Sequence, residues 1–401
     1  MLSEKRNLVF ELVLDPEVIK FTHMQNAASW RPDFMTMMDY TQRERMLGSC
    51  EVSKADASQE MQTRFPDSSQ YLGIKYYVLK DLDLPHTSKT SQIVSSCETL
   101  NRVGLAVTPK SQGAVRPVLT ACIGGVFTIP EHRGRKYGGE MIKRLNKYLD
   151  GISSPPDAPE FVQDIVTVLY SEVGEFYSKF GYVSRPVPLH TVEALDEILD
   201  SYCGGDSVAR KDGYNIGFDC GDHLIDLEKQ EFVQDLQKAH SKHPDAFVFS
   251  VEPSKDIYKW FHERFLFQKK FLDPESQVEY GYALNNGSHV IWHLNYWPDE
   301  KALYILKVYT SGETIAERDA NLKDLMARTI QEAKKNGVER LQFWNSELGQ
   351  QDWSKPFMAS LQKKEKPSNL YQENPSLSAI RIANVKPEDI VWEHNAKFCW
   401  F

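Results

Sequence analysis

The sequence lacks the features that mark extracellular, metal-binding or membrane-spanning proteins. None of its six cysteines forms a Cys-x-x-Cys pair, so the spacing indicates neither a zinc site nor a disulfide framework. The opening segment MLSEKRNLVFELVLDP has no apolar signal core, and no apolar run is long enough to span a bilayer. We therefore expect a soluble intracellular protein with reduced thiols, in the cytoplasm or also in the nucleus, without a membrane partner or a metal ion.

An excess of positive charge is lacking as well. The 401 residues include 47 Lys and Arg against 56 Asp and Glu, a formal net charge of −9, and no long basic run. This balance argues against a nucleic-acid partner. The length predicts more than one domain, and clustered turn residues indicate the boundary. We expect a domain of residues 1–205, a linker of residues 206–220 and a second domain of residues 221–401.

The most informative segment is residues 118–149. An apolar run over residues 118–129 predicts a strand, residues 133–139 (RGRKYGG) form a basic, glycine-rich turn, and the following residues have helical spacing. Such a turn can hold a diphosphate, because free backbone N–H groups point out of it and the helix dipole favours negative charge there. The cations Arg133, Arg135 and Lys136 strengthen this interpretation. An ordinary strand, turn and helix with a basic cap is the alternative.

A second segment follows the same pattern of a strand and a helix. Residues 165–170 are a β-rich run typical of a buried strand. After it, Val173, Phe176, Tyr177 and Phe180 share one face of a short predicted helix that Gly181 ends. On this pattern alone, Tyr177 is a packed aromatic residue.

Both segments resemble motifs of the GNAT acetyltransferases, which bind acetyl-coenzyme A. The pyrophosphate-binding motif reads Arg/Gln-x-x-Gly-x-Gly/Ala; Arg133 and Gly138 match its ends, whereas Lys136 replaces the middle glycine. A lysine there has a steric cost at positive φ that glycine does not have. The second motif closes with Tyr-x-x-Phe-Gly-Tyr/Phe, and its tyrosine often protonates the departing thiolate. The resemblance implies this role for Tyr177, whose hydroxyl stays protonated at neutral pH.

Over nearly its full length the chain is similar to the fungal lysine N-epsilon-acetyltransferase family. The similarity rests on residues 97–102 (CETLNR), 126–128 (VFT), 133–137 (RGRKY) and 397–401 (KFCWF). It implies free L-lysine as the acceptor of the acetyl group and acetyl-coenzyme A as the cosubstrate. The candidate cofactor-binding residues are Val126, Phe127, Thr128, Arg133, Gly134, Arg135, Lys136, Tyr137, Gly138 and Gly139.

The candidate catalytic residues are Tyr177, Glu98 and Phe401. A lysinium needs a carboxylate to bind and a base or water path to lose its proton; Glu98 is the candidate for binding, with a solvated strand acid as an equal alternative. Residues 171–182 also resemble the bacterial "enhanced intracellular survival" acetyltransferases, which use a C-terminal carboxylate as base, and this implies the same role for the Phe401 carboxylate. His132 and His190 are possible bases, but we expect surface positions for both.

The expected elements predict an α/β (α+β) protein in which an N-terminal GNAT fold has a mixed, splayed central sheet and a second, degenerate GNAT-like domain follows. In the first domain we expect strands at residues 7–14, 70–80, 92–107, 118–129, 165–170 and 182–189. In the second we expect strands at residues 278–284, 289–297, 302–309 and 339–344 and helices at residues 315–335 and 353–362. No basic, glycine-rich turn lies between Tyr309 and Ala316, so we expect no second coenzyme A site.

The sequence therefore predicts an acetyl-coenzyme A-dependent N-acetyltransferase. The expected reaction is direct attack by a primary amine, in a ternary complex. Two alternatives stay open. The chain could be a GNAT-fold interaction protein with weak catalysis, or an acetyltransferase that acts on proteins, aminoglycosides or other amines. The oligomeric state is not indicated by the sequence.

Overall fold

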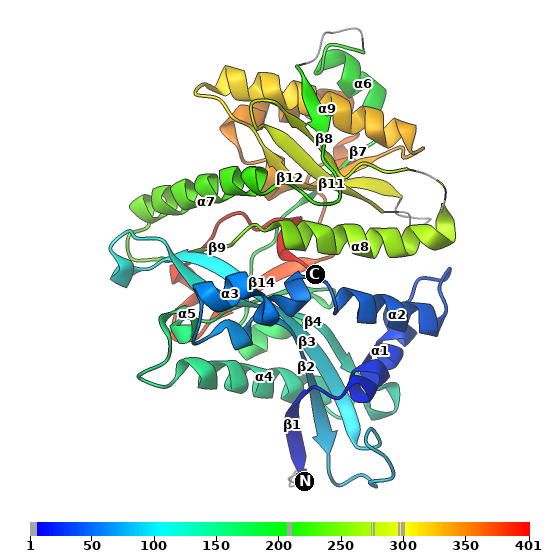
Figure 1. Cartoon of the computed structure of the whole chain (residues 1–401), viewed down its shortest axis with the longest axis vertical. Coiled ribbons are helices and arrows are strands. Elements are labelled where there is room, and N and C mark those ends of the chain that lie inside the picture. The colour runs from blue at the N-terminus through cyan, green and yellow to red at the C-terminus, as the bar shows by residue number, and fades with distance from the viewer. Residues whose placement is uncertain (1–5, 207–210, 274, 276, 296, 298–300) are drawn as a thin grey trace.

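The protein consists of two β-sheets with helices around them, one sheet in each half of the molecule (Figure 1). The computed structural model describes residues 6–206, 211–273, 275, 277–295, 297 and 301–401. Residues 207–210 of the predicted linker and residue 296 of a predicted strand lie outside this range. Two long helices, α7 (Asp222–Lys242) and α8 (Lys255–Leu272), lie between the two sheets.

The first sheet has nine strands, and its main path runs β1-β2-β3-β4-β5-β14-β6. Most pairs are antiparallel, but β4 and β5 are parallel, which confirms the expected mixed sheet. The strands are β1 (Leu8–Val13), β2 (Gly73–Asp81), β3 (Ile93–Val107), β4 (Arg116–Thr128), β5 (Val166–Ser171), β6 (Val183–Ser184), β9 (Phe247–Val251), β14 (Leu377–Ile382) and β15 (Ile390–Trp392).

The sheet opens at the carboxyl end of its central strands. Strands β4 and β5 pair only from Thr120 with Val166 to Ile123 with Leu169, although β4 continues to Thr128. Beyond the last pair the two strands diverge, and the expected splay is confirmed. The helices of this half are α1 (Pro16–Trp30), α2 (Met37–Leu47), α3 (Gln59–Arg64), α4 (Tyr137–Ser153) and α5 (Glu160–Gln163). Helix α4 buries Met141, Ile142, Leu145 and Leu149, on the predicted face.

The second sheet has six strands in the order β7-β13-β12-β11-β10-β8. Its strands are β7 (Leu189–Val192), β8 (Gly213–Asn215), β10 (Gly281–Leu284), β11 (His289–Asn295), β12 (Ala302–Tyr309) and β13 (Leu341–Trp344). Its helices are α6 (Leu195–Ser201), α9 (Ile315–Lys335), α10 (Asn345–Leu348) and α11 (Lys355–Lys364). The four strands and two helices expected here are present, with shifts of a few residues at their ends.

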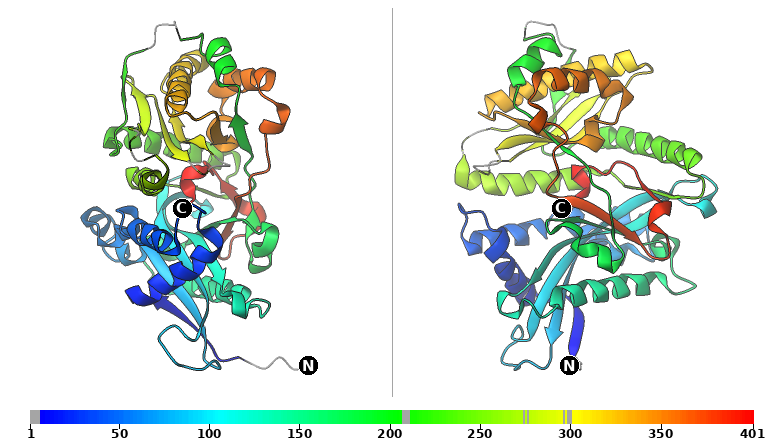
Figure 2. Two further views of the ribbon diagram at one scale, coloured as in Figure 1. Left: turned by 90° about the vertical axis from the view of Figure 1, so that its right-hand side faces the viewer. Right: turned by 180° about the vertical axis from the view of Figure 1, so that it is seen from behind.

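The strands do not divide between the sheets at residues 206–220. Strand β9 pairs with β3, β14 pairs with β5, and β15 extends the first sheet through β9. Conversely, β7 precedes the predicted linker and joins the second sheet through β13. Seen from behind, the C-terminal strand runs beside the strands of the first half (Figure 2). The domain boundaries stay a prediction, whereas the exchanged strands tie the two halves together.

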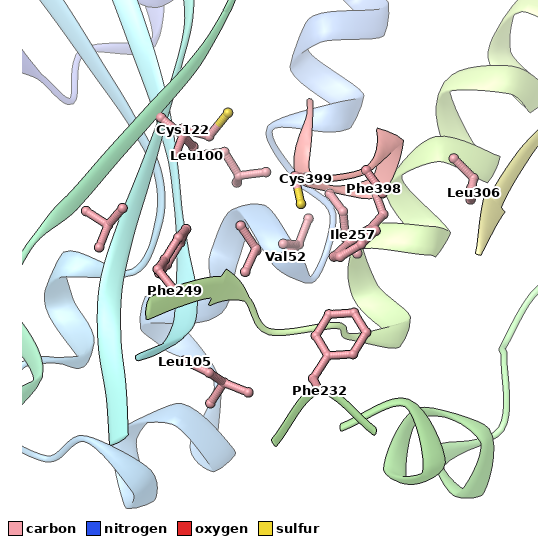
Figure 3. Packing of buried hydrophobic residues seen from close by; sticks show 14 of the residues in the cluster. Val52, Leu100, Leu105, Cys122, Phe232, Phe249, Ile257, Leu306, Phe398 and Cys399 are labelled. Atoms are coloured by element: carbon pink, nitrogen blue, oxygen red, sulfur yellow. The ribbon is translucent and has the colours of Figure 1, made fainter. Parts of the chain in front are cut away.

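A shared hydrophobic core fills the region between the halves. Its buried members include Leu100 and Cys122 from the first sheet, Phe232 and Ile257 from α7 and α8, and Phe398 near the chain end. Figure 3 shows these side chains converging from both halves. Burial of apolar side chains is the main stabilising contribution in folding, so this core fixes α8 and the C-terminal segment relative to the first sheet.

Two expectations about the first half are wrong in detail. The helix expected after β5 is a 3-10 helix, Gly174–Phe180, which starts at a glycine with φ of 56° and ends at Gly181 with φ of 88°. The edge strand expected over residues 182–189 is reduced to β6, because Leu189 already pairs with β13 of the other sheet. Glu175, with φ of −76° and ψ of 20°, also lies outside the helical region, so the segment does not form a regular α-helix.

Candidate active site

The glycine-rich turn lies between β4 and α4, as predicted. Gly134 has φ of 77° and Lys136 has φ of 66°, and Lys136 is the residue that immediately precedes the helix. Lysine therefore adopts the left-handed conformation for which glycine is usual, at a cost of about 1–2 kcal/mol. No side chain caps the first turn of α4, so its N–H groups are available to an anion.

The residues around this turn differ in what they can offer a diphosphate. Arg133 is exposed; its Nε donates a hydrogen bond to the carbonyl of Thr128 (3.2 Å), and its guanidinium lies over the Phe127 ring. A Cβ at Gly138 would lie 3.3 Å from Thr128 Oγ1, a close approach that glycine permits. The Tyr137 side chain is buried and donates to Asp81, so Tyr137 could meet a ligand only through its backbone.

A cavity of about 540 Å³ lies at the opening of the first sheet; we call it the central cavity. It is formed by β3, β4 and β5 together with α1, α2, α8 and the C-terminal segment, and it includes all three candidate catalytic residues, Glu98, Tyr177 and Phe401. Arg133 and residues 126–128 line it as well. A larger cavity of about 800 Å³ lies beside α7, but none of the predicted site residues lines it.

A β-bulge shapes the floor of the central cavity. Ser96 pairs with Phe127 and Glu98 with Gly124, so two residues of β4, Gly125 and Val126, lie opposite one residue of β3. Gly125 has φ of 57°. Such bulges leave the extra residue outside the ladder and redirect the backbone, which here is the backbone that faces the cavity. Phe127 itself is buried, so its contribution to a ligand would also come from its backbone.

Glu98 lies beside this bulge and is paired with a histidine. A Cβ on Gly125 would lie 3.3 Å from Glu98 Oε1, and His23 Nε2 lies 3.6 Å from Glu98 Oε2. Burial lowers the pKa of His23, but the Glu98 carboxylate more than offsets this effect, so the pKa is raised above its ordinary value. Glu98 is therefore not the solvated strand acid that the alternative interpretation described.

Tyr177 lines the cavity from the 3-10 helix after β5. Its ring contacts those of Phe176 and Tyr182, while its hydroxyl makes no hydrogen bond to any residue that the structure describes. Burial, followed by the nearby Cys97 and Glu172, raises the pKa of Tyr177 well above its ordinary value. The hydroxyl is thus a protonated donor without a partner inside the cavity.

The C-terminal segment ends between the two halves (Figures 1 and 2), and Trp400 and Phe401 line the central cavity. Arg102 on β3 is buried and donates hydrogen bonds to the carbonyls of Phe398 (2.9 Å) and Cys399. The Phe401 ring lies against β4, where a Cβ on Gly124 would be 2.9 Å from it. The Trp400 ring packs against Trp260 of α8. The segment is thus held at both its backbone and its side chains.

A group of charged residues that the sequence analysis did not predict lies on α2 and α8. Arg43 is buried and donates from Nε (2.8 Å) and Nη2 (2.5 Å) to Glu44 Oε1, while its Nη1 has no partner. Arg264 lines the cavity beside them. Each arginine is one of several charged residues in its helix, and no sequence pattern distinguishes it; only the packing of α2 against α8 brings the two together.

The remaining candidates are arranged differently. His190, expected at the surface, is fully buried in the second sheet, where it stacks on Phe343 and hydrogen-bonds Asn345 (2.9 Å). Glu172, which is not among the predicted catalytic residues, also lines the central cavity; it is exposed and accepts a hydrogen bond from Trp30 (3.3 Å). At the start of α9 in the second half, Thr314 and Glu317 form a capping box. This helix N-terminus is already occupied by its own side chains.

The six cysteines are all buried and free. Within the described ranges, no group of three or more His, Cys, Asp or Glu residues is arranged to hold a metal ion. A search of the same residues also found no helix long and apolar enough to cross a bilayer.

Comparisons with known proteins reveal relatives of the whole chain. The family described as the LYC1 GNAT-like C-terminal domain matches residues 221–401. The uncharacterized protein YGR111W of Saccharomyces cerevisiae is 41% identical over 402 residues, which cover 100% of this chain and 99% of that protein. A lysine acetyltransferase of Yarrowia lipolytica is 26% identical over 290 residues, 63% of this chain and 69% of that protein. A probable N-acyltransferase structure from Enterococcus faecalis V583 aligns with 94% of this chain and 73% of its own, with a TM-score of 0.49 and 12% identity.

Proposed function

Because the chain belongs to the GNAT acetyltransferase family that carries the LYC1 GNAT-like C-terminal domain, we propose that it transfers an acetyl group from acetyl-coenzyme A to a primary amine, most simply the side-chain amine of free L-lysine. The observation that supports this best is the central cavity. It joins the turn at residues 133–139 to a free tyrosine hydroxyl and a carboxylate, Glu98.

Acetyl-coenzyme A would supply an activated thioester. The exposed N–H groups of α4 and the cations Arg133 and Arg135 suit its diphosphate. The bulge at Gly125 and Val126 offers backbone donors for the thioester oxygen. Because Gly138 has no Cβ, it leaves space beside Thr128 for a ligand that extends from the turn to the bulge.

In this reaction the chain has three tasks. Glu98, paired with His23, attracts the acceptor as an ammonium ion and holds it near the bulge. The acceptor nitrogen must lose a proton before it attacks, either to a carboxylate or through water. As the new C–N bond forms and the C–S bond breaks, the Tyr177 hydroxyl gives its proton to the departing sulfur. The roles of Tyr177, Glu98 and Phe401 stay predictions.

The direct test is an acceptor screen with the purified protein. Release of the coenzyme A thiol is followed with L-lysine, spermidine, an aminoglycoside and a lysine-containing peptide, and the products are identified by mass. Transfer to L-lysine with addition of one acetyl group on the side-chain amine supports the proposal. Stoichiometric binding of acetyl-coenzyme A without turnover on any amine would instead identify an interaction protein, and transfer to the peptide alone would identify a protein acetyltransferase.

A further inference from the structure

The central cavity contains a cation, Arg264, that forms no ion pair with any residue the structure describes. Arg264 projects from α8 of the second half, lines the cavity, and makes no hydrogen bond or ion pair with any described residue. Burial, followed by repulsion from Arg43, lowers the pKa of Arg264 to about 10, so the side chain remains charged at neutral pH. Arg264 is half-buried. Charges that are largely withdrawn from water are normally paired, so an unpaired one that faces a cavity indicates an absent anion.

The acids that attract Arg264, Glu44 and Glu172, already have other partners. Arg43 occupies one oxygen of the Glu44 carboxylate with two donors, and Glu172 accepts a hydrogen bond from Trp30. The attraction of Arg43, followed by that of Arg264, holds the pKa of Glu44 below its ordinary value despite its burial. The donors of Arg264 are therefore all free, and the buried Arg43 adds the partnerless Nη1.

Aromatic contacts orient the Arg264 side chain without using its donors. Its guanidinium lies 4.7 Å from the centre of the Trp400 ring and 5.5 Å from that of Trp260. Stacking of this kind uses the flat face of the guanidinium. The N–H groups lie in the plane of the guanidinium and remain free, in the fork that matches both oxygens of a carboxylate.

The opposite charge lies elsewhere in the same cavity. Glu98 on β3 suits an ammonium group, whereas Arg264 and Arg43 suit a carboxylate. A molecule that carries both groups can satisfy both ends at once. The diphosphate of a coenzyme already has a suitable site of its own, because the turn at residues 133–139 precedes the uncapped N-terminus of α4.

We propose that Arg264, assisted by Arg43, binds the carboxylate of the acceptor and so makes the enzyme specific for amino acids over amines without a carboxylate. This inference rests on the proposed acetyl transfer. It gives the second half a role in acceptor choice, since α8 provides the carboxylate site and the first sheet provides the acetyl-transfer site.

The experiment compares L-lysine with L-lysinamide, in which an uncharged amide replaces the carboxylate. For the unaltered protein we expect kcat/KM for L-lysine to exceed that for L-lysinamide by about 10- to 100-fold, the usual range for a charged hydrogen-bonded contact. In Arg264→Gln this preference should disappear through a raised KM for L-lysine, with L-lysinamide and acetyl-coenzyme A little affected. Arg264→Lys should retain part of it, and Lys270→Met, which removes an exposed cation from the same helix, should retain all of it.

Each outcome separates the two proposals. An equal preference in the unaltered protein and in Arg264→Gln overturns the role of Arg264, while acetyl transfer stands. If no amine is acetylated, the proposed function fails, and calorimetric titration of the coenzyme A-bound protein with the two ligands still tests the carboxylate site. Thermal unfolding and acetyl-coenzyme A affinity identify a variant that has merely lost its fold, in which case Arg264→Lys is the deciding variant.

Discussion

Replacement of Tyr177 by phenylalanine separates catalysis from folding. The Tyr177 hydroxyl makes no hydrogen bond to a described residue, so its removal leaves no buried group without a hydrogen-bond partner. We therefore expect the free energy of unfolding to change by less than about 0.5 kcal/mol. The rate of acetyl transfer should fall about 10²-fold or more, the usual contribution of a positioned general acid. This loss corresponds to about 3 kcal/mol of activation free energy.

Tyr182 is the matched control, since its ring contacts that of Tyr177 and it carries the same hydroxyl. That hydroxyl is buried and donates to Asn146 Oδ1 (2.8 Å). Tyr182→Phe leaves the acceptor oxygen of Asn146 without this partner and should cost about 1–3 kcal/mol of stability, with little change in rate per folded molecule. The two variants should therefore show opposite effects.

The assays are thiol release at saturating acetyl-coenzyme A and denaturant unfolding. Since burial raises the pKa of Tyr177, its phenol should stay protonated across the stable pH range, and the rate should not fall on the alkaline side through its ionisation. A Tyr177→Phe rate within a factor of two or three of the unaltered protein would refute the assignment and return Tyr177 to the packed core.

Three further predictions concern the cofactor, the pH and the chain end. Gly138→Val should weaken acetyl-coenzyme A binding by about tenfold or more in calorimetry, because the added atoms crowd Thr128. The control variant Gly151→Val, in open space on the same helix, should bind acetyl-coenzyme A as the unaltered protein does. Equal affinities of the two variants would contradict the assignment of the turn. Burial lowers the pKa of His262 to about 4 in the folded protein, whereas its pKa in the unfolded chain is about 6.5. Between these two pH values only the unfolded state binds the proton, so the free energy of unfolding should fall by about 1.4 kcal/mol for each pH unit of acidification. A His262→Gln variant whose stability falls equally steeply with pH would contradict this. A short extension after Phe401 should abolish transfer but not acetyl-coenzyme A binding, and full activity of the extended protein would reject the carboxylate as base.

Elements with strong local signals can be predicted from the sequence. Helix α9 has the expected bounds, Ile315–Lys335, because its apolar period is regular and its ends carry a capping box and a glycine. The turn at residues 133–139 is recognisable because glycines and cations that suit a phosphate are adjacent in the chain. In such segments, the physics that forms the element acts between neighbours along the chain.

The missed elements depend on partners far away in the sequence. Strand β9 is five buried residues that pair with β3, more than 140 residues earlier, and no local pattern indicates which sheet it joins. For His190 we expect a surface position from the sequence. Pairing of β7 with β13 instead buries it against Phe343. Position in the fold, rather than residue type, decides such cases.

The same reasoning explains why the central cavity is only half predictable. The first sheet and its connections contain Tyr177, Glu98 and the turn, in segments with recognisable sequence patterns. In contrast, Arg43 and Arg264 form a candidate binding site only because α8 packs on α2. A guanidinium on an isolated helix would be fully hydrated and would attract a carboxylate weakly. Covered by Trp260 and Trp400, it loses competing water, and the same charge interacts far more strongly at the lower effective dielectric constant. The exchanged strands and the shared core hold α8 against the first sheet. They therefore stabilise the fold and also determine how strongly Arg264 attracts an anion in the cavity.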